Sequence, residues 1–252
     1  MAISDQLTQL NTIKQNIRTA INNKGGSVGN NFSTYAAAIT ALPVTSSGTI
    51  VFGKAEVITI NPVNSAMKTI PAHALRGWTA PTGLVVGEGI ETLSDYAFNG
   101  WSSAVSLSLP STLKTLGQFA LAGWTAFTGT ITVPDAVTSI GTSACQGNTL
   151  MTGFKIGNNV VSLPTGVLAS SPALKTLEIG TGVTSIAANF LTQAVAVTTI
   201  IVRATTPPTV NSSGTFFNGI PTSAAIKVPA TSVDAYKTAT GWSVFAAQIS
   251  AI

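Results

Sequence analysis

Apolar residues recur along the middle of the chain with a period of about 23 residues. One column of such positions holds Met67, Ile90, Leu113, Val137, Val160 and Val183. A second column, three residues further on, holds Ile70, Leu93, Leu116, Ile140, Leu163 and Ile186. Self-similarity at a fixed period predicts about six repeated units, each of which buries its apolar face against its neighbours.

Each unit also carries two apolar residues separated by one residue, and this alternation predicts a short strand. The pairs are Leu84/Val86, Leu107/Leu109, Ile131/Val133, Phe154/Ile156, Leu177/Ile179 and Ile200/Val202. Stacked units would pair these strands in parallel, so residues 65–204 are expected to form a solenoid. The third unit is one residue longer than the others, between Ala120 and Ile131, and we expect this insertion only to lengthen a loop.

The first 42 residues do not repeat and show a helical pattern instead. Apolar residues spaced by three or four, followed by Gly25-Gly26, predict an amphipathic helix, and a second stripe ending before Pro43 predicts a shorter one. The two stripes include Leu7, Leu10, Ile13, Ile17, Ile21, Phe32, Tyr35 and Ile39. A hairpin of this size cannot bury so large a stripe alone. Residues 1–42 are therefore predicted to mediate attachment or oligomerisation, with residues 43–64 as a linker or small β segment.

Residues 205–252 differ from the repeats and are predicted to cap the solenoid. Ser232 is placed to cap a short helix, and Trp242, Phe245 and Ile249 could cover the apolar column that the last strand would otherwise expose. The expected fold is thus an α+β repeat protein, with a helical hairpin at one end of a parallel-strand solenoid and a cap at the other.

Composition narrows the possible partners. Only 8% of residues are charged, and the 12 basic residues are scattered, so nucleic acid is not an expected partner. No apolar run is long enough to span a membrane, and the N-terminus lacks the pattern of a secretory signal. Cys145 is the single cysteine, and no His/Cys cluster offers metal ligands. We expect no cofactor, no metal and no Sec export.

Catalysis is not expected either. His73, the single histidine, lacks a Ser/Asp partner at a spacing that suggests a triad, and is interpreted as a polar turn residue. Glu88, Glu91 and Asp95 form the one local cluster of acids, and Asp135 lies two units beyond Glu88. A polysaccharide-degrading enzyme would need two carboxylates about 5 to 9.5 Å apart, and turn acids on a solenoid are usually solvated surface groups.

Two sets of repeated positions are candidates for ligand binding. Trp78, Trp101 and Trp124 are spaced by 23 and 23 residues and should lie one above another, where they could hold sugar faces or pack in the interior. Lys155 and Glu178 occupy adjacent outward positions of the predicted sheet and could pair or contact a ligand. The outward column comprises Val85, Ser108, Thr132, Lys155, Glu178 and Ile201.

The repeat closely resembles the BspA-like class of leucine-rich repeats. The resemblance rests on residues 90–101, IETLSDYAFNGW, followed by 107–110, LSLP. Three units carry Trp where that class usually has Cys. The tail resembles the same family's C-terminal cap in TPPTV at 206–210, FFNG at 216–219 and VPA at 228–230. The resemblance implies a leucine-rich-repeat fold and, as one function, a bacterial or protist surface adhesin.

Residues 13–26, IKQNIRTAINNKGG, and 32–39, FSTYAAAI, resemble the N-terminal segment of phage tail, baseplate and head-fibre proteins. That resemblance implies a virion protein made in the host cytoplasm, anchored to capsid, tail or baseplate proteins and displaying the solenoid to a host-surface glycan or protein. The expected assembly is a homo-oligomer, specifically a trimer. The virion fibre is the leading hypothesis from sequence; the surface adhesin and the degrading spike are its alternatives.

Overall fold

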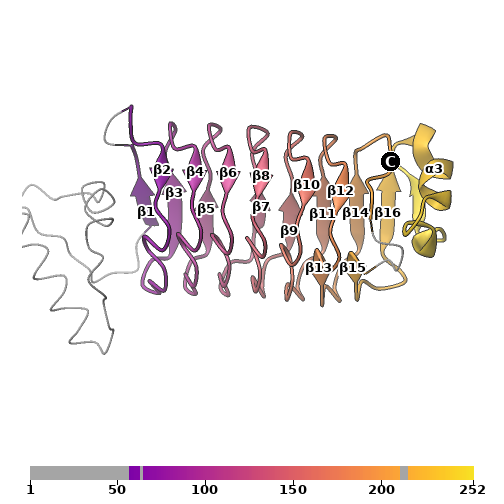
Figure 1. Ribbon diagram of the computed structural model, residues 1–252. Coiled ribbons are helices and arrows are strands. Elements are labelled where there is room, and N and C mark those ends of the chain that lie inside the picture. Colours follow the sequence, from indigo (N-terminus) through magenta and orange to yellow (C-terminus); the bar gives the residue numbers. More distant parts are fainter. Residues whose placement is uncertain (1–56, 63–64, 211–214) are drawn as a thin grey trace, which may run out of the picture. The chain divides into compact units, whose positions relative to one another are not determined.

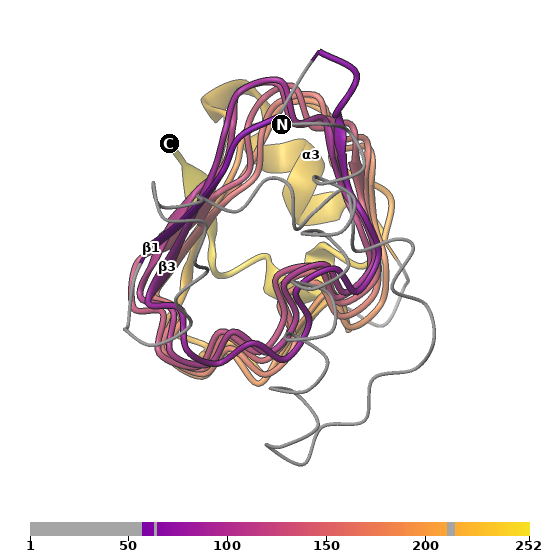
Figure 2. The same cartoon turned by 90° about the vertical axis from the view of Figure 1, so that its left-hand side faces the viewer.

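The computed structural model describes residues 57–62, 65–210 and 215–252, which form a solenoid of stacked coils (Figure 1). Viewed along the stack, successive coils superpose on one another (Figure 2). Each coil has three sides: a longer strand, a short strand and a side made of turns. The hairpin predicted over residues 1–42, with its attachment and oligomerisation residues, lies outside the described residues, as does most of the segment 43–64.

The longer strands pair in parallel, as the alternating apolar residues predict. Ile131, Phe154 and Leu177 lie directly opposite one another in successive strands. One sheet contains β1 (Val57–Ile60), β3 (Gly83–Val86) and β5 (Ser106–Ser108). The other contains β7 (Thr130–Thr132), β9 (Gly153–Lys155), β11 (Thr176–Ile179), β14 (Thr199–Val202), β16 (Ala225–Val228) and β17 (Ile249–Ala251). The pairing extends into both flanking segments, because β1 precedes residue 65 and β16 and β17 follow residue 204.

The expectation that the insertion only lengthens a loop is wrong. The extra residue lies before β7, and the longer strands form two separate sheets that end at β5 and begin at β7. Leu107 and Leu109 are half-buried there, whereas the equivalent Ile131 and Val133 are buried. The short strands still pair across this point, from β6 to β8. The insertion therefore interrupts one side of the stack and leaves another side continuous.

The short strands make the second side of the coils. Each buries its second residue and turns its first residue, a serine or threonine, outward. One ladder contains β2 (Thr69–Ile70), β4 (Thr92–Leu93), β6 (Thr115–Leu116) and β8 (Ser139–Ile140), and a second contains β10 (Ser162–Leu163) and β12 (Ser185–Ile186). An isolated parallel bridge between Ser185 and Thr209 continues the second ladder by one coil.

The third side consists of turns that hydrogen-bond from coil to coil. The backbone N–H of Tyr96 donates to the Gln118 carbonyl at 2.8 Å, and that of Phe119 donates to the Thr142 carbonyl at 3.2 Å. Near the C-terminal end, β13 (Leu191–Thr192) and β15 (Phe217–Asn218) pair on this side. Many of these turns have two positions with positive φ angles. Glycine often occupies the second of the two, as at Gly100 with φ 81°.

The C-terminal end of the stack carries the short helices (Figure 1). They are two 3-10 helices, Ala230–Ser232 and Ser243–Phe245, and α3 (Val233–Thr238). Ser232 lies before α3 but makes no capping hydrogen bond; its hydroxyl donates to the Thr205 carbonyl at 2.7 Å instead. Trp242 is fully buried against Phe216 and Tyr236.

Candidate ligand-binding surface

The tryptophan column belongs mainly to the core. Trp101 and Trp124 are 0% exposed, and their rings stack with centroids 5.6 Å apart. Each indole Nε1–H donates to a carbonyl of the preceding coil, from Trp101 to Leu75 at 2.7 Å and from Trp124 to Phe98 at 2.9 Å. Trp78 is half-buried and meets Trp101 edge-on. Trp101 and Trp124 therefore pack in the interior, as one of the two alternatives predicts, and they expose no surface to a ligand.

The next coil supports this structural role. Asn148 follows Trp124 in the column and is also fully buried. Its Nδ2 donates to the Leu121 carbonyl at 3.1 Å, as the indole nitrogens do one and two coils earlier, and its Oδ1 accepts the Trp124 backbone N–H at 2.8 Å. In three successive coils, at Trp101, Trp124 and Asn148, the column thus supplies a side-chain donor to a carbonyl of the coil before it, and an indole ring is one way to do so.

A different aromatic column lies on the surface of the turn side. The rings of His73 and Tyr96 stack with centroids 4.8 Å apart and an interplanar angle of 7°, and those of Tyr96 and Phe119 with centroids 4.9 Å apart and an angle of 16°. His73 is exposed, and Tyr96 and Phe119 are half-buried. We call these three stacked side chains the aromatic ladder.

The backbone beneath the aromatic ladder is in an unfavourable conformation. His73, Tyr96 and Phe119 have φ angles of 58°, 58° and 52°, in the left-handed region. For bulky L-residues this region costs about 1 to 2 kcal/mol each. Coils further along place Ser143, Gly166 and Asn189 at the same turn position, and of these residue types glycine and asparagine adopt this conformation more readily. Aromatic rings therefore occupy three successive positions where smaller residues would fit at lower cost.

Arg76 adds a cation to the ladder. Its guanidinium carbon lies 4.8 Å from the Tyr96 ring centroid, and its Nη1 is 3.5 Å from Nδ1 of His73. Such a cation–π contact contributes about 0.5 to 1 kcal/mol at an exposed site. Among the described residues, the ion pairs involve other basic side chains, so Arg76 is held by rings and not by a carboxylate.

The outward residues Lys155 and Glu178 are paired, as their positions in the sequence suggest. Lys155 Nζ lies 3.5 Å from Glu178 Oε1, and Arg203 Nε lies 2.5 Å from the same oxygen. A similar group on the short-strand side places Glu91 between Lys68 and Lys114. Each glutamate ties three successive coils together through surface ion pairs of small individual strength.

The carboxylates of the predicted acidic cluster also bridge coils. Glu88 accepts hydrogen bonds from the N–H and hydroxyl of Ser111, and Asp95 Oδ1 accepts the Gln118 N–H at 2.8 Å. Hydrogen bonds from Ser111 lower the pKa of Glu88, and those from Lys114 and Lys68 lower that of Glu91. The general acid of a glycosidase needs a raised pKa at neutral pH, so neither Glu88 nor Glu91 suits that role.

Acid should weaken the stack. The hydrogen bond from Arg203 is the main cause that lowers the Glu178 pKa below its ordinary value of about 4.5. A carboxylate with a depressed folded-state pKa contributes stability above its unfolded pKa, and this is lost as pH falls through the folded pKa. The urea unfolding midpoint is therefore expected to fall between pH 7 and pH 3, and the fall should be smaller in Glu178→Gln. Equal pH dependence in both proteins would contradict this role of Glu178.

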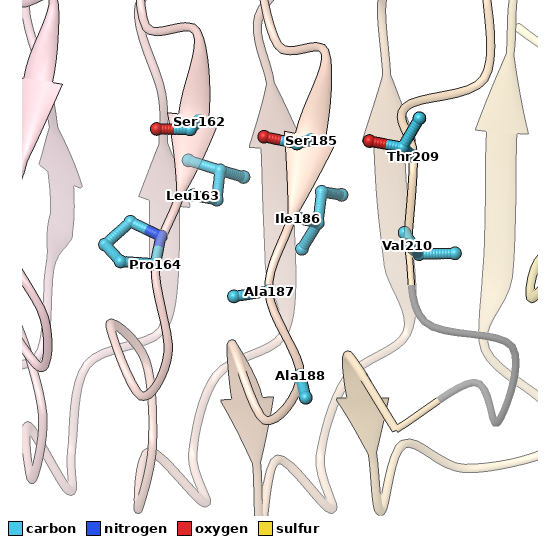
Figure 3. A pocket seen from close by; sticks show the side chains of 9 residues that line it. All are labelled: Ser162, Leu163, Pro164, Ser185, Ile186, Ala187, Ala188, Thr209 and Val210. Atoms are coloured by element: carbon cyan, nitrogen blue, oxygen red, sulfur yellow. The ribbon is translucent and has the colours of Figure 1, made fainter.

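A shallow hollow of about 420 Å³ lies on the short-strand side (Figure 3). The side chains of Ser162, Ser185 and Thr209 line one part of it in a row, one from each coil. The remaining lining residues are Leu163, Pro164, Ile186, Ala187, Ala188 and Val210. None of the lining residues is charged or titratable, so the hollow offers no acid, base or metal ligand. Residues 211–214, which follow Val210 in the sequence, lie outside the described residues.

Three further properties concern the described residues alone. No group of three or more His, Cys, Asp or Glu side chains is placed to hold a metal ion there. None of the described helices has the length and apolar character needed to cross a bilayer. Cys145 is fully buried, and burial raises the pKa of its thiol. The surface feature that stands out chemically is thus the aromatic ladder with Arg76.

Sequence reasoning did not identify the aromatic ladder. His73, Tyr96 and Phe119 are spaced by 23 and 23 residues, as are the tryptophans five residues further along. The spacing was therefore available as a signal. It does not tell which of the two columns faces solvent.

Comparison with protein families gives a match over most of the solenoid. The model described as "BspA type Leucine rich repeat region" matches in six copies over residues 45–198. The match starts before residue 57, and it extends through β12 and β13. No curated protein sequence matches the chain significantly.

Several solved structures share the fold. The pneumococcal vaccine antigen PcpA is 20% identical with a TM-score of 0.50, over 77% of this chain and 39% of that one. A leucine-rich repeat protein from Bacteroides ovatus is 16% identical with a TM-score of 0.54, over 75% and 51%. The T. pallidum leucine-rich repeat protein is 13% identical with a TM-score of 0.52, over 65% and 80%. The matched region spans about two fifths and one half of the first two, and such identities indicate a shared fold only.

Proposed function

Because the chain belongs to the BspA-type leucine-rich repeat family, we propose that it is a non-enzymatic binding protein of the adhesin type, whose solenoid presents the aromatic ladder to a ligand. The observation that carries this proposal is the aromatic ladder itself. Three aromatic rings keep partial exposure at left-handed backbone positions, where the same repeat elsewhere uses serine, glycine or asparagine. Tyrosine and arginine, here Tyr96 and the Arg76 that lies on its ring, are among the residue types most enriched where binding energy is concentrated.

The charges of the molecule support binding over catalysis. Glu88, Glu91 and Glu178 are engaged by neighbouring coils, and their lowered pKa values suit structural ties. The polysaccharide-degrading spike gains no support from these groups. A degrading enzyme would produce new reducing ends when it is incubated with capsular polysaccharide. If incubation with this chain produced them, the non-enzymatic proposal would be overturned.

The family match favours the surface adhesin over the virion fibre. The virion hypothesis, its homotrimer and its location in a phage particle rest on residues 1–42, which lie outside the described residues. They stay predictions. If they are correct, deletion of residues 1–42 should abolish incorporation into particles while the solenoid still folds.

The proposed function predicts measurable adhesion. Beads coated with the full chain should adhere to surfaces bearing host-type glycans or extracellular-matrix proteins, and soluble chain should compete with them. Beads coated with heat-unfolded chain are the matched control, since they carry the same composition without the ordered surface. Equal adhesion of folded and unfolded chain, or no adhesion of either, would contradict the proposal.

A further inference from the structure

The aromatic ladder stops at Phe119, although its column of turn positions continues. The Phe119 N–H donates to the Thr142 carbonyl, and the Ser143 N–H donates to the Thr165 carbonyl. Ser143 and Gly166 therefore occupy the next two rungs of the same column. A serine side chain ends at its γ oxygen and glycine has none, whereas a phenyl ring extends well beyond its γ carbon. The side of the Phe119 ring that faces Ser143 is thus not covered by another ring of the column.

The short residues at these two rungs are themselves closely fitted. Ser143 is 7% exposed. A Cβ atom on Gly166 would lie 2.8 Å from the Ser143 hydroxyl oxygen, so that hydroxyl points toward the Gly166 rung. The half-buried phenyl ring of Phe119 therefore extends outward beyond the Ser143 hydroxyl and the Gly166 backbone.

Two glutamines lie in the turns that form this surface, Gln118 in the turn of Phe119 and Gln146 in the turn of Ser143. Gln118 precedes Phe119, and Gln146 follows Ser143 by three residues, the place that Arg76 has relative to His73. Both glutamines are half-buried, and their side-chain amides make no hydrogen bond to the part of the chain that the structure describes. Each amide offers two donors and an acceptor. They are suited to hydroxyl groups, which both donate and accept.

Charge is absent from the three turns that form the site. Residues 117–123, 141–147 and 164–170 contain no Asp, Glu, Lys or Arg. Asp95, one coil earlier, is engaged by the Gln118 N–H, and Arg76 lies on the Tyr96 ring. Single-stranded nucleic acid also stacks on aromatic rings but needs a positively charged path for its phosphates. A ligand at this site should therefore be uncharged.

Resting on the proposed binding function, we propose that the Phe119 face above Ser143 and Gly166 is a subsite for one pyranose ring of a neutral saccharide. The C–H face of the sugar ring extends the aromatic ladder by one more layer, against the electron-rich phenyl face. The hydroxyls at the rim of the sugar bond to the Gln118 and Gln146 amides. An apolar peptide side chain is a poorer occupant, because it offers no hydrogen-bond partner to either amide.

The first test removes the phenyl face without disturbing the turn. In Phe119→Asn the new residue is the one that this chain uses at the equivalent position 189, where φ is 56°. The full chain is applied to an array of neutral glucose, galactose, mannose and N-acetylglucosamine oligomers, and the best binder is titrated by calorimetry. The dissociation constant should rise about tenfold or more in Phe119→Asn, the scale of one lost stacking contact, with an unchanged thermal midpoint.

A second variant covers the face instead of removing it. Ser143→Phe adds a fourth ring to the aromatic ladder and should weaken saccharide binding to a similar extent. Asn189→Gly is the matched control, since it changes the same turn position one coil beyond Gly166, outside the site, and should bind as the original chain does.

The outcomes separate this proposal from the adhesin function. If the chain adheres to surfaces but no neutral saccharide binds, or if both variants bind it as the original chain does, the subsite is wrong and the adhesin function stands. Preferential binding of a single-stranded oligonucleotide or an aromatic peptide, abolished by Phe119→Asn, would also overturn the saccharide assignment. If nothing binds the folded chain at all, both proposals fail.

Discussion

Replacing Trp124 by alanine is expected to lower the free energy of unfolding by about 4 kcal/mol, the usual range for a fully buried tryptophan. The indole ring is 0% exposed and stacks on Trp101. Its removal leaves a cavity between two coils. The Phe98 carbonyl also loses the hydrogen bond that it accepts from the Trp124 Nε1–H at 2.9 Å. Urea unfolding followed by circular dichroism measures the change.

The same substitution at Trp78 is the matched control for Trp124→Ala. Trp78 occupies the equivalent position two coils earlier but is half-buried, so Trp78→Ala should cost about half as much, because the cost scales with the buried area lost. Equal losses for the two variants would contradict the assignment of Trp124 to the core.

Replacing Gly141 by alanine is expected to destabilise the stack by about 3 kcal/mol, the upper part of the range for overpacking. A Cβ atom at this position would lie 2.4 Å from the Gln118 nitrogen and 2.6 Å from the Gly117 carbonyl carbon. Both are backbone atoms of the preceding coil, so the two coils must separate. The loss of the hydrogen bond from the Gly141 N–H to the Leu116 carbonyl, now 2.7 Å, should accompany the separation.

A control for Gly141→Ala tests whether the effect is steric. Gly77 has a positive φ of 73°, but a Cβ atom there would meet nothing within 4 Å. Gly77→Ala should cost only about 1 kcal/mol, from the left-handed conformation alone. The chain tolerates such residues at the equivalent position, at Ser170 and Gln193. A larger loss at Gly77 than at Gly141 would contradict the close approach of the coils.

Side chains on the strands could be predicted from the sequence because a strand alternates its two faces. The apolar pairs at positions such as Phe154 and Ile156 are buried, and Lys155 between them is exposed. The parallel pairing follows from the repeat length, since one coil separates successive strands. The split between β5 and β7 could not be predicted, because the sequence shows the extra residue but not which side of the coil it disrupts.

The candidate site lies on the turn side, where neither helical nor strand periodicity applies. Tyr96 and Trp101 are five residues apart in one turn, yet one ring is half-exposed and the other is fully buried. The difference arises from left-handed residues such as Tyr96 and Gly100, which redirect the chain within the turn. The amino-acid sequence shows that two aromatic columns repeat. It does not show the order of backbone angles in the turn that directs one column of rings into the core.

The column of Trp101 and Trp124 stabilises the fold, and we assign ligand binding to the separate aromatic ladder; this division between the two columns can be tested. Its most direct test is a paired measurement of thermal midpoint and saccharide affinity for Phe119→Asn and Trp124→Phe. Phe119→Asn should lose affinity about tenfold or more at an unchanged midpoint, and Trp124→Phe should lower the midpoint and keep the affinity. The reverse result, with binding lost in Trp124→Phe and kept in Phe119→Asn, would contradict the account.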